Sequence, residues 1–221
     1  QVIVDRFVAS ANLEAKRALY PAPKVLRRWD EVPQRNEEVA PGTQITRHEL
    51  DFWGGDLQSL ATKLDYVQAL GADVLYLNPI HLGFTNHKYD SLDFQAVSPE
   101  YGTRADVKAL AAELHRRQMK LVLDGVFNHM GRNAPAFKQA EADAKAATRN
   151  WFVFGPQFPG GARTWKGVLN LPELNLENPA VRQHIWAGRE SVVRSYLRDG
   201  ADGWRLDTAY ELGQVYLSQL T

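Results

Sequence analysis

The sequence has no cysteine among its 221 residues. Disulfide bonds, thiolate metal sites and a cysteine nucleophile are therefore excluded, but the compartment stays open because a secreted protein need not carry disulfides. The chain also lacks net charge, since 26 basic residues balance 26 acidic ones. This balance argues against nucleic acid or an anionic membrane as the main partner, because both would select a basic surface.

Long apolar runs are absent as well. No run approaches the roughly 18 residues that a membrane-spanning helix needs, and no basic-then-apolar signal segment follows Gln1. Because the chain starts at glutamine and not at methionine, we expect that an upstream segment was removed. The share of hydrophobic residues, 44%, is typical of a folded soluble chain, for which cytoplasmic, periplasmic and secreted locations all stay open.

Short apolar runs alternate with amphipathic segments along the chain. The runs predict four strands, at 1–4, 73–77, 120–123 and 203–207, and helical spacing predicts three helices, at 56–70, 103–118 and 179–198. Continuous apolar strands between amphipathic helices indicate a parallel sheet covered by helices, which is an α/β architecture.

Two segments are too long to be simple connections between these elements. Residues 12–50 are charged and proline-bearing and are interpreted as a long loop, unusual unless it is functional. Residues 130–178 are rich in glycine, proline and aromatic residues and are interpreted as an insertion. The chain is therefore expected to divide into 1–129, the insertion 130–178, and a return to the sheet at 179–221.

Polar residues follow the carboxyl end of every predicted strand. They are Asp5, Asn78, the segment from Asp124 to His129, and the pair Arg205 and Asp207. In a (β/α) barrel the loops from neighbouring strands converge at this rim and build the active site. The four strand ends are therefore expected to form one site.

Arg205 and Asp207 lie two residues apart in a strand, so both side chains point to the same face. A carboxylate beside a guanidinium stays ionised, which suits a nucleophile and does not suit a proton donor. Asp124 could meet the same guanidinium from the preceding strand. A structural ion pair is the alternative interpretation, and a lone histidine such as His129 is more often structural than functional.

Several motifs resemble those of the α-amylase family of glycoside hydrolases. They are GADVLYLNPI (71–80), FTNHKYDSLDFQAVSPEYGT (84–103), DGVFNH (124–129), LPELN (171–175) and GADGWRLD (200–207), which follow the family's order over nearly the whole chain. The segments FWGGDL, TNHKYD and LPELN are similar to the neopullulanase, cyclomaltodextrinase and maltogenic-amylase group. The resemblance implies the first half of a (β/α)8 TIM barrel, strands one to four, with a B-domain insertion after strand three.

The resemblance also implies roles for individual residues. Asp207 matches the nucleophile of a retaining mechanism, and Arg205 matches the arginine that orients it. The residues that match sugar-binding positions are His87, Tyr89, His129 and Trp165, while Asp90, Asp124 and Asn128 match positions that support the site. No cofactor is implied for the chemistry, and Asn128 is a candidate calcium ligand because that asparagine binds calcium in some members.

The implied partner is an α-glucan with α-1,4 and perhaps α-1,6 linkages, such as maltodextrin, cyclodextrin or starch, and the implied reaction is hydrolysis with some transfer. The parent protein is a candidate homo-oligomer.

On the leaving-group side, Glu211 agrees with the neopullulanase group, whereas Tyr210 stands where that group usually has asparagine. The family's general-acid glutamate would lie beyond Thr221, so the isolated chain is expected to be inactive without the C-terminal half of the barrel.

Three alternatives stay open from the sequence. One is a barrel homologue that binds carbohydrate without catalysis. Another is an inactive barrel fragment. The third is a metal-dependent hydrolase that would use His81, His87 and His129 as ligands, although no metal-site spacing supports it.

Overall fold

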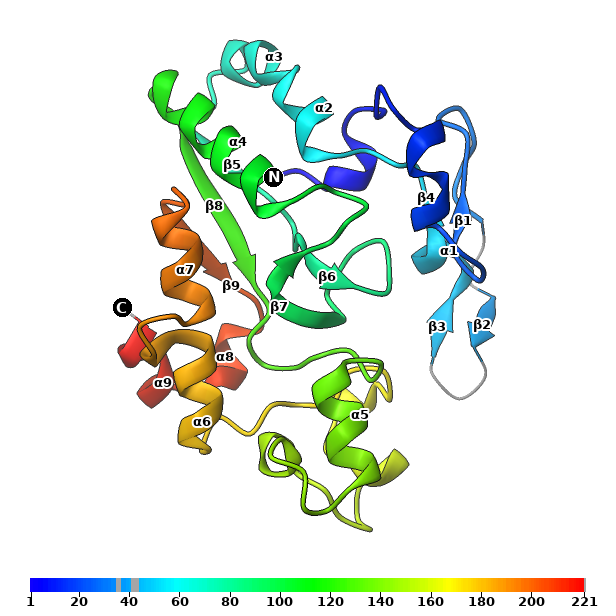
Figure 1. Ribbon diagram of the computed structural model, residues 1–221, viewed down its shortest axis with the longest axis vertical. Helices are drawn as coiled ribbons and strands as arrows, with labels where there is room; N and C mark the ends of the chain where they lie inside the picture. Colours follow the sequence, from blue (N-terminus) through cyan, green and yellow to red (C-terminus); the bar gives the residue numbers. More distant parts are fainter. Residues whose placement is uncertain (35–36, 41–43, 221) are drawn as a thin grey trace.

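The computed structural model describes residues 1–34, 37–40 and 44–220, and a three-stranded parallel sheet organises the chain (Figure 1). Its strands are β5 (Val74–Tyr76), β8 (Lys120–Gly125) and β9 (Gly203–Leu206), paired in the order β5-β8-β9. Val2 adds one parallel bridge to Leu77 at the β5 side. Because the pairing is parallel, the carboxyl ends of these strands meet at one edge of the sheet.

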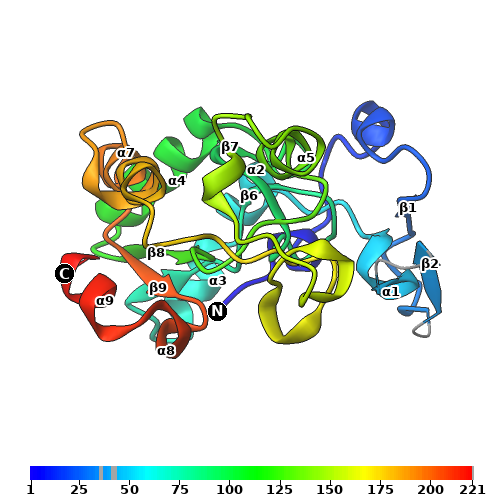
Figure 2. The same cartoon turned by 90° about the horizontal axis from the view of Figure 1, so that it is seen from below.

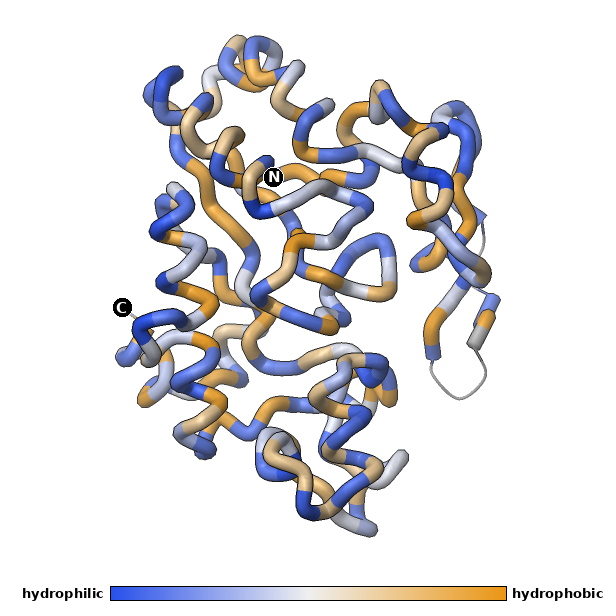
Figure 3. The backbone as a smooth tube through the Cα atoms, in the orientation of Figure 1, coloured by the Kyte–Doolittle hydropathy of each residue, from blue (hydrophilic) through white to orange (hydrophobic). Residues whose placement is uncertain are grey.

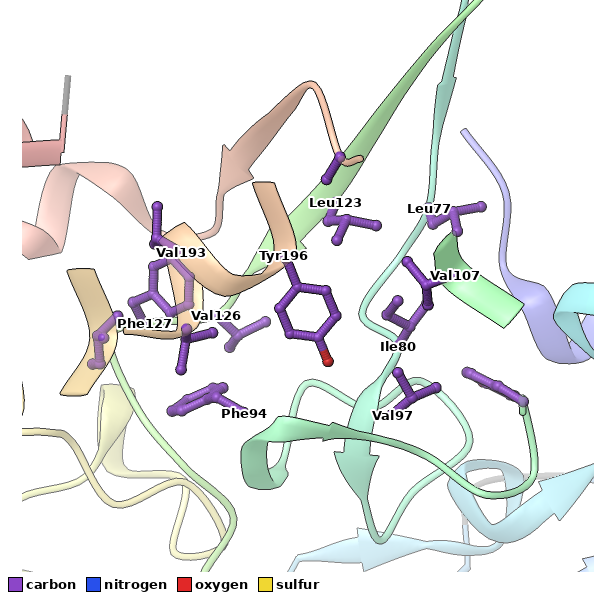
Figure 4. Close-up of a cluster of buried hydrophobic side chains, with 14 of the residues drawn as sticks. Leu77, Ile80, Phe94, Val97, Val107, Leu123, Val126, Phe127, Val193 and Tyr196 are labelled. Carbon is purple, nitrogen blue, oxygen red and sulfur yellow. The ribbon is translucent and has the colours of Figure 1, made fainter. Parts of the chain in front are cut away.

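Hydrophobic side chains fill the space between the sheet and its helices. The middle of β8 is hydrophobic (Figure 3), and its Leu121 and Leu123 are fully buried. Helix α4 (Arg104–Arg116), which begins at a capping box on Thr103, packs on β8, and α7 (Val192–Arg198) contributes Tyr196 to the same core (Figure 4). The buried positions of β8 face these helices, whereas Val74 on β5 and Arg205 on β9 are exposed.

The other elements are short. Three two-stranded pairs are present: β1 (Val25–Leu26) with β4 (Asp51–Phe52), β2 (Glu38–Ala40) with β3 (Ile45–Thr46), and β6 (His81–Gly83) with β7 (Ser91–Val97). The remaining helices are α1 (Arg47–Leu50), α2 (Leu57–Ala61), α3 (Leu64–Ala69), α5 (Pro135–Ala142), α6 (Pro179–Arg182), α8 (Ala209–Leu212) and α9 (Gln214–Leu220). Short 3₁₀ segments lie at Val4–Arg6, Glu14–Leu19, Arg149–Trp151, Pro159–Gly161 and Trp165–Gly167. Figure 2 shows α8 and α9 beside β9 at one end of the molecule and α1 with β2 at the other.

The strands expected at 73–77, 120–123 and 203–207 and the helix expected at 103–118 are present. The strand expected at 1–4 is wrong beyond its single bridge, because a 3₁₀ turn begins at Val4. The helix expected at 56–70 begins after the N-cap Asp56, as its pattern predicts, but is interrupted at Lys63, where ψ is 14°.

The single helix expected at 179–198 is also wrong. Helix α6 continues into a π-helical turn at Gln183–Ala187, which ends with the Gly188 N–H donating to the Gln183 carbonyl at 3.0 Å. The backbone then turns, and Ser191 caps a new helix, α7. Gly188 permits this break, because a Cβ there would lie 2.5 Å from the same Gln183 oxygen.

The two long connections contain structure of their own. Much of the segment 12–50 is folded into a 3₁₀ segment, short strands and α1. The expectation of a plain loop is therefore wrong for the described part of this segment. Residues 35–36 and 41–43 lie outside the described residues. Residues 130–178 contain α5 and isolated bridges around Phe137, Phe152 and Phe154, whose rings are in contact. Within the described ranges, no helix is long and apolar enough to cross a bilayer.

Gly55 offers a test of how tightly the start of the chain packs. A Cβ at Gly55 would lie 2.2 Å from the Val4 carbonyl oxygen, which is backbone and cannot rotate away. We expect Gly55→Ala to lower the free energy of unfolding by about 2–3 kcal/mol in urea titrations. Gly71→Ala is the control: Gly71 has a positive φ of 76° but nothing within 4 Å, so it should cost only about 1 kcal/mol. Equal losses in the two variants would contradict the packing argument.

Candidate active site

One guanidinium nitrogen links two carboxylates at the carboxyl edge of the sheet. Arg205 on β9 pairs in register with Asp124 on β8. Its Nη1 lies 3.0 and 3.2 Å from the two Asp124 oxygens and 2.6 Å from Oδ1 of Asp207. The structure thus brings together the three charged residues that the strand ends were expected to supply.

Asp124 is the buried member of this cluster, with a fully covered side chain. It accepts hydrogen bonds from the hydroxyl groups of Tyr76 and, at 3.0 Å, Tyr89. Burial raises the pKa of Asp124, although the bonds from Tyr76 and Arg205 oppose that shift. Burial also works against the charge of Arg205, but its contacts with Asp124 outweigh this and raise the pKa of Arg205.

Sequence reasoning missed Tyr76. It was read only as part of a buried strand, yet its hydroxyl reaches Asp124 across the sheet. The one available signal was the position of this tyrosine, whose ring has a polar tip. It lies two positions before Asn78, at the end of an otherwise apolar strand.

A cavity of about 500 Å³ lies beside this cluster. Its lining residues are Glu49, His87, Tyr89, His129, Trp165, Val168, Leu171, Asp207 and Thr208. Four of these were expected to bind sugar, and Asp207 was expected to react with it. Another cavity, of about 520 Å³, lies by α7 among Arg189, Arg194 and Arg198 and contains none of the expected site residues.

Asp207 lies on a constrained turn. Its N–H donates to the Gly125 carbonyl at 3.0 Å, which extends the β8–β9 pairing by one residue. Thr208 then adopts a left-handed conformation with φ of 45°, uncommon for a β-branched residue. Such strain is often found at functional sites, where the surrounding structure holds it in place.

Both histidines of the cavity have defined partners. Nε2 of His129 lies 3.2 Å from the Tyr89 carbonyl oxygen and so carries the proton that it donates there. Burial lowers the pKa of His129 to about 4 despite the opposing effect of Asp207, which keeps the ring neutral near pH 7. The ring of His129 lies 5.7 Å from that of Trp165, and the ring of His87 lies 5.7 Å from that of Tyr89.

The loop that carries His87 and Tyr89 is held from within. Asp90 accepts hydrogen bonds from the Thr85 N–H at 3.2 Å, so it braces the turn between β6 and β7. The Tyr89 hydroxyl donates to Asp124 and accepts from the Asn78 amide at 3.3 Å. Burial raises the pKa of Tyr89 to about 12, so the ring stays uncharged.

Tyr210 and Glu211 do not line the cavity that Asp207 lines. Tyr210, on α8, is 70% exposed, and its ring lies 5.5 Å from the Lys166 ammonium. Glu211 lines a different cavity, of about 450 Å³, together with Asn128, Arg163 and Glu173. The leaving-group role implied for these two residues therefore stays a prediction.

The residues of that second cavity do not fit calcium. Nε of Arg163 lies 2.6 Å from Oε2 of Glu173, so a guanidinium already balances one of the carboxylates that line this cavity with Asn128. Among the described residues, no group of three histidine, aspartate or glutamate side chains could hold a metal ion. Calcium would have to compete with this guanidinium for Glu173.

His81 is not part of either cavity. It is fully buried, stacks on Trp204 with ring centroids 5.8 Å apart, and contacts Phe94 and Tyr196 edge-on. This packing argues against the metal-dependent alternative, which needs His81 beside His87 and His129.

Comparison with known proteins identifies the family of the chain. Residues 1–218 match the alpha-amylase catalytic domain, so the chain belongs to the alpha-amylase family, whose catalytic domain is a (β/α)8 barrel. The chain is 34% identical over 170 residues to an intracellular maltogenic amylase of Bacillus subtilis, and 34% identical over 178 residues to neopullulanase 2 of Thermoactinomyces vulgaris. These matches cover 75% and 77% of this chain but only 28% and 29% of the relatives.

A solved structure of a related enzyme is similar to this chain over its whole length. The cyclic alpha-maltosyl-(1→6)-maltose hydrolase of Arthrobacter globiformis, in complex with its named sugar, superposes with a TM-score of 0.81 at 33% identity. The superposition covers 100% of this chain and 46% of that enzyme. The chain therefore spans less than a third of its curated relatives and about half of this solved relative.

The Arg163–Glu173 pair leads to a prediction about calcium. We propose that no calcium binds at Asn128, so excess EDTA or millimolar calcium should shift the melting temperature of the purified protein by no more than about 1 °C. Magnesium at the same concentration controls for ionic strength. A calcium-specific rise of several degrees that EDTA reverses would contradict this assignment.

Proposed function

We propose that this chain carries the nucleophile half of a retaining α-glucan hydrolase. The observation that carries the proposal is the contact of Arg205 Nη1 with both Asp124 and Asp207, beside a cavity lined by Tyr89 and Trp165. Aromatic side chains with a few polar groups are typical of sugar-binding sites, because a sugar ring has an apolar face and a hydroxyl rim.

In this proposal Asp207 attacks the anomeric carbon and forms a covalent glycosyl-enzyme, which water then hydrolyses. Arg205 places a fixed positive charge beside the attacking oxygen and holds it in line. His129 lines the same cavity as a neutral ring, so it adds no charge beside the sugar.

A retaining glycosidase also needs a carboxylic acid about 5 Å from the nucleophile to protonate the leaving oxygen. Among the described residues, Glu49 is the one other carboxylate that lines the cavity. Burial would raise the pKa of Glu49, but hydrogen bonds from His87 and Thr46 outweigh it and lower the pKa to about 2. Glu49 is therefore ionised at neutral pH and cannot be the acid.

We infer that the acid comes from sequence outside residues 1–221, in the second half of the barrel. On this basis Val2, β5, β8 and β9 correspond to the first four barrel strands, residues 130–178 to a B domain, and residues 1–129 and 179–221 to parts of domain A. The expected substrates are maltodextrin, cyclodextrin or starch with α-1,4 and α-1,6 bonds, which is in keeping with the named activities of the relatives.

Replacing Asp207 tests the reaction directly. In the protein that contains this chain, Asp207→Asn should lower kcat on maltodextrin by about 10⁴-fold or more, because an amide cannot attack the anomeric carbon. Binding of maltodextrin, measured by calorimetry, should persist. Asp65→Asn, on α3 and paired only with Arg117 at the surface, is the matched control and should keep normal turnover. Near-normal turnover of Asp207→Asn would refute the nucleophile assignment.

Two variants at Tyr89 separate its ring from its hydroxyl. Tyr89→Ala should lower kcat/KM by roughly 10–100-fold, equivalent to about 1–3 kcal/mol of lost stacking. Tyr89→Phe keeps the ring and loses only the hydroxyl bonds to Asp124 and Asn78, so its loss should be several-fold smaller. If the two variants lose the same amount, the ring does not contact the sugar.

A further inference from the structure

Residues 12–50 have no expected role in the site, yet their end reaches the cavity. Helix α1 brings Glu49 to the cavity wall beside His87. We propose that Glu49 is a positioning residue: its carboxylate fixes the orientation and tautomer of the His87 imidazole, so that the ring keeps its place in the cavity wall beside Tyr89. This proposal rests on the proposed function of the cavity.

The hydrogen-bond network defines the tautomer of His87. The Tyr89 N–H lies 3.1 Å from Nδ1 of His87, so that nitrogen must accept. In a neutral imidazole the proton then resides on Nε2, which lies 3.1 Å from Oε1 of Glu49. The ring is thereby fixed from both sides, by a backbone amide of its own loop and by a carboxylate from α1.

Glu49 is itself held in place. Its Oε2 accepts from the Thr46 N–H at 2.6 Å and from the Thr46 hydroxyl at 2.8 Å, in the capping box that begins α1. A residue anchored by its own helix loses little conformational entropy when it binds a histidine, and such outer partners commonly fix the orientation of a functional imidazole.

The backbone of α1 is also docked on the loop that carries His87. The Asn86 side-chain amide donates to the carbonyl oxygens of His48 at 2.6 Å and Asp51 at 2.7 Å, and the Asn86 N–H donates to the Glu49 carbonyl at 2.7 Å. These bonds place the end of the 12–50 segment against the loop from Thr85 to Asp90. The segment therefore acts as a support for the sugar-binding loop.

A double-mutant cycle tests whether Glu49 acts through His87. In the protein that contains this chain, Glu49→Ala should lower kcat/KM on maltodextrin by about 10–100-fold, the usual cost of removing an orienting partner. Glu49→Gln keeps a single oxygen, which can accept from Nε2 only by giving up the capping-box bond to Thr46, so this variant should recover part of that loss. In a His87→Ala background, Glu49→Ala should cost less than about 2-fold more, because the side chain it orients is gone.

Glu31→Ala is the matched control in the same segment, since that side chain is paired only loosely with Arg27 and lies outside the cavity. Thermal unfolding of every variant separates loss of fold from loss of positioning, because Glu49→Gln and Glu49→Ala both weaken the capping box. A full further loss in the His87→Ala background, or a Glu49→Gln variant as impaired as Glu49→Ala, would overturn the proposal. Turnover that survives Asp207→Asn would instead refute the proposed function, so the two failures are distinguishable.

Discussion

The contact of Arg205 with Asp124 is the interaction on which the rest of the site depends. It joins β9 to β8, and Asp124 in turn takes the hydroxyl groups of Tyr76 on β5 and Tyr89 on the β6–β7 loop. The Asp124 side chain is fully buried although Arg205 is partly exposed, so removing Arg205 would leave a buried carboxylate without its counter-charge. The position of Asp207 follows from the same guanidinium, which contacts it at 2.6 Å.

The sheet positions the charged residues of the site, and the two long connections supply side chains that line the cavity beside them. Glu49 comes from the segment before β4, and Trp165 comes from the insertion between β8 and α6. The insertion is tied back to the sheet end, because the Leu174 N–H donates to the Asn128 carbonyl at 2.9 Å. A rigid sheet with variable loops above it is the arrangement by which barrel enzymes change substrate while keeping their chemistry.

The parts that local patterns dictate could be predicted from the sequence. The apolar run of β8, the capped amphipathic α4 and the same-face pair Arg205 and Asp207 each follow from spacing alone. The break at Gly188 depends on a π-helical turn that has no residue signature, and the reach of Glu49 to His87 joins positions 38 apart in the chain. Such long-range contacts are set by tertiary packing, which periodicity does not encode.

Trapping the covalent intermediate would test the central claim most directly. A fluorinated glucosyl donor that forms the glycosyl-enzyme rapidly but releases it slowly should label the protein once, and peptide mass spectrometry locates the label. We predict that the sugar is attached to the peptide containing Asp207 and that Asp207→Asn abolishes the labelling. A label on any other carboxylate, or turnover of this donor without any covalent species, would contradict the account.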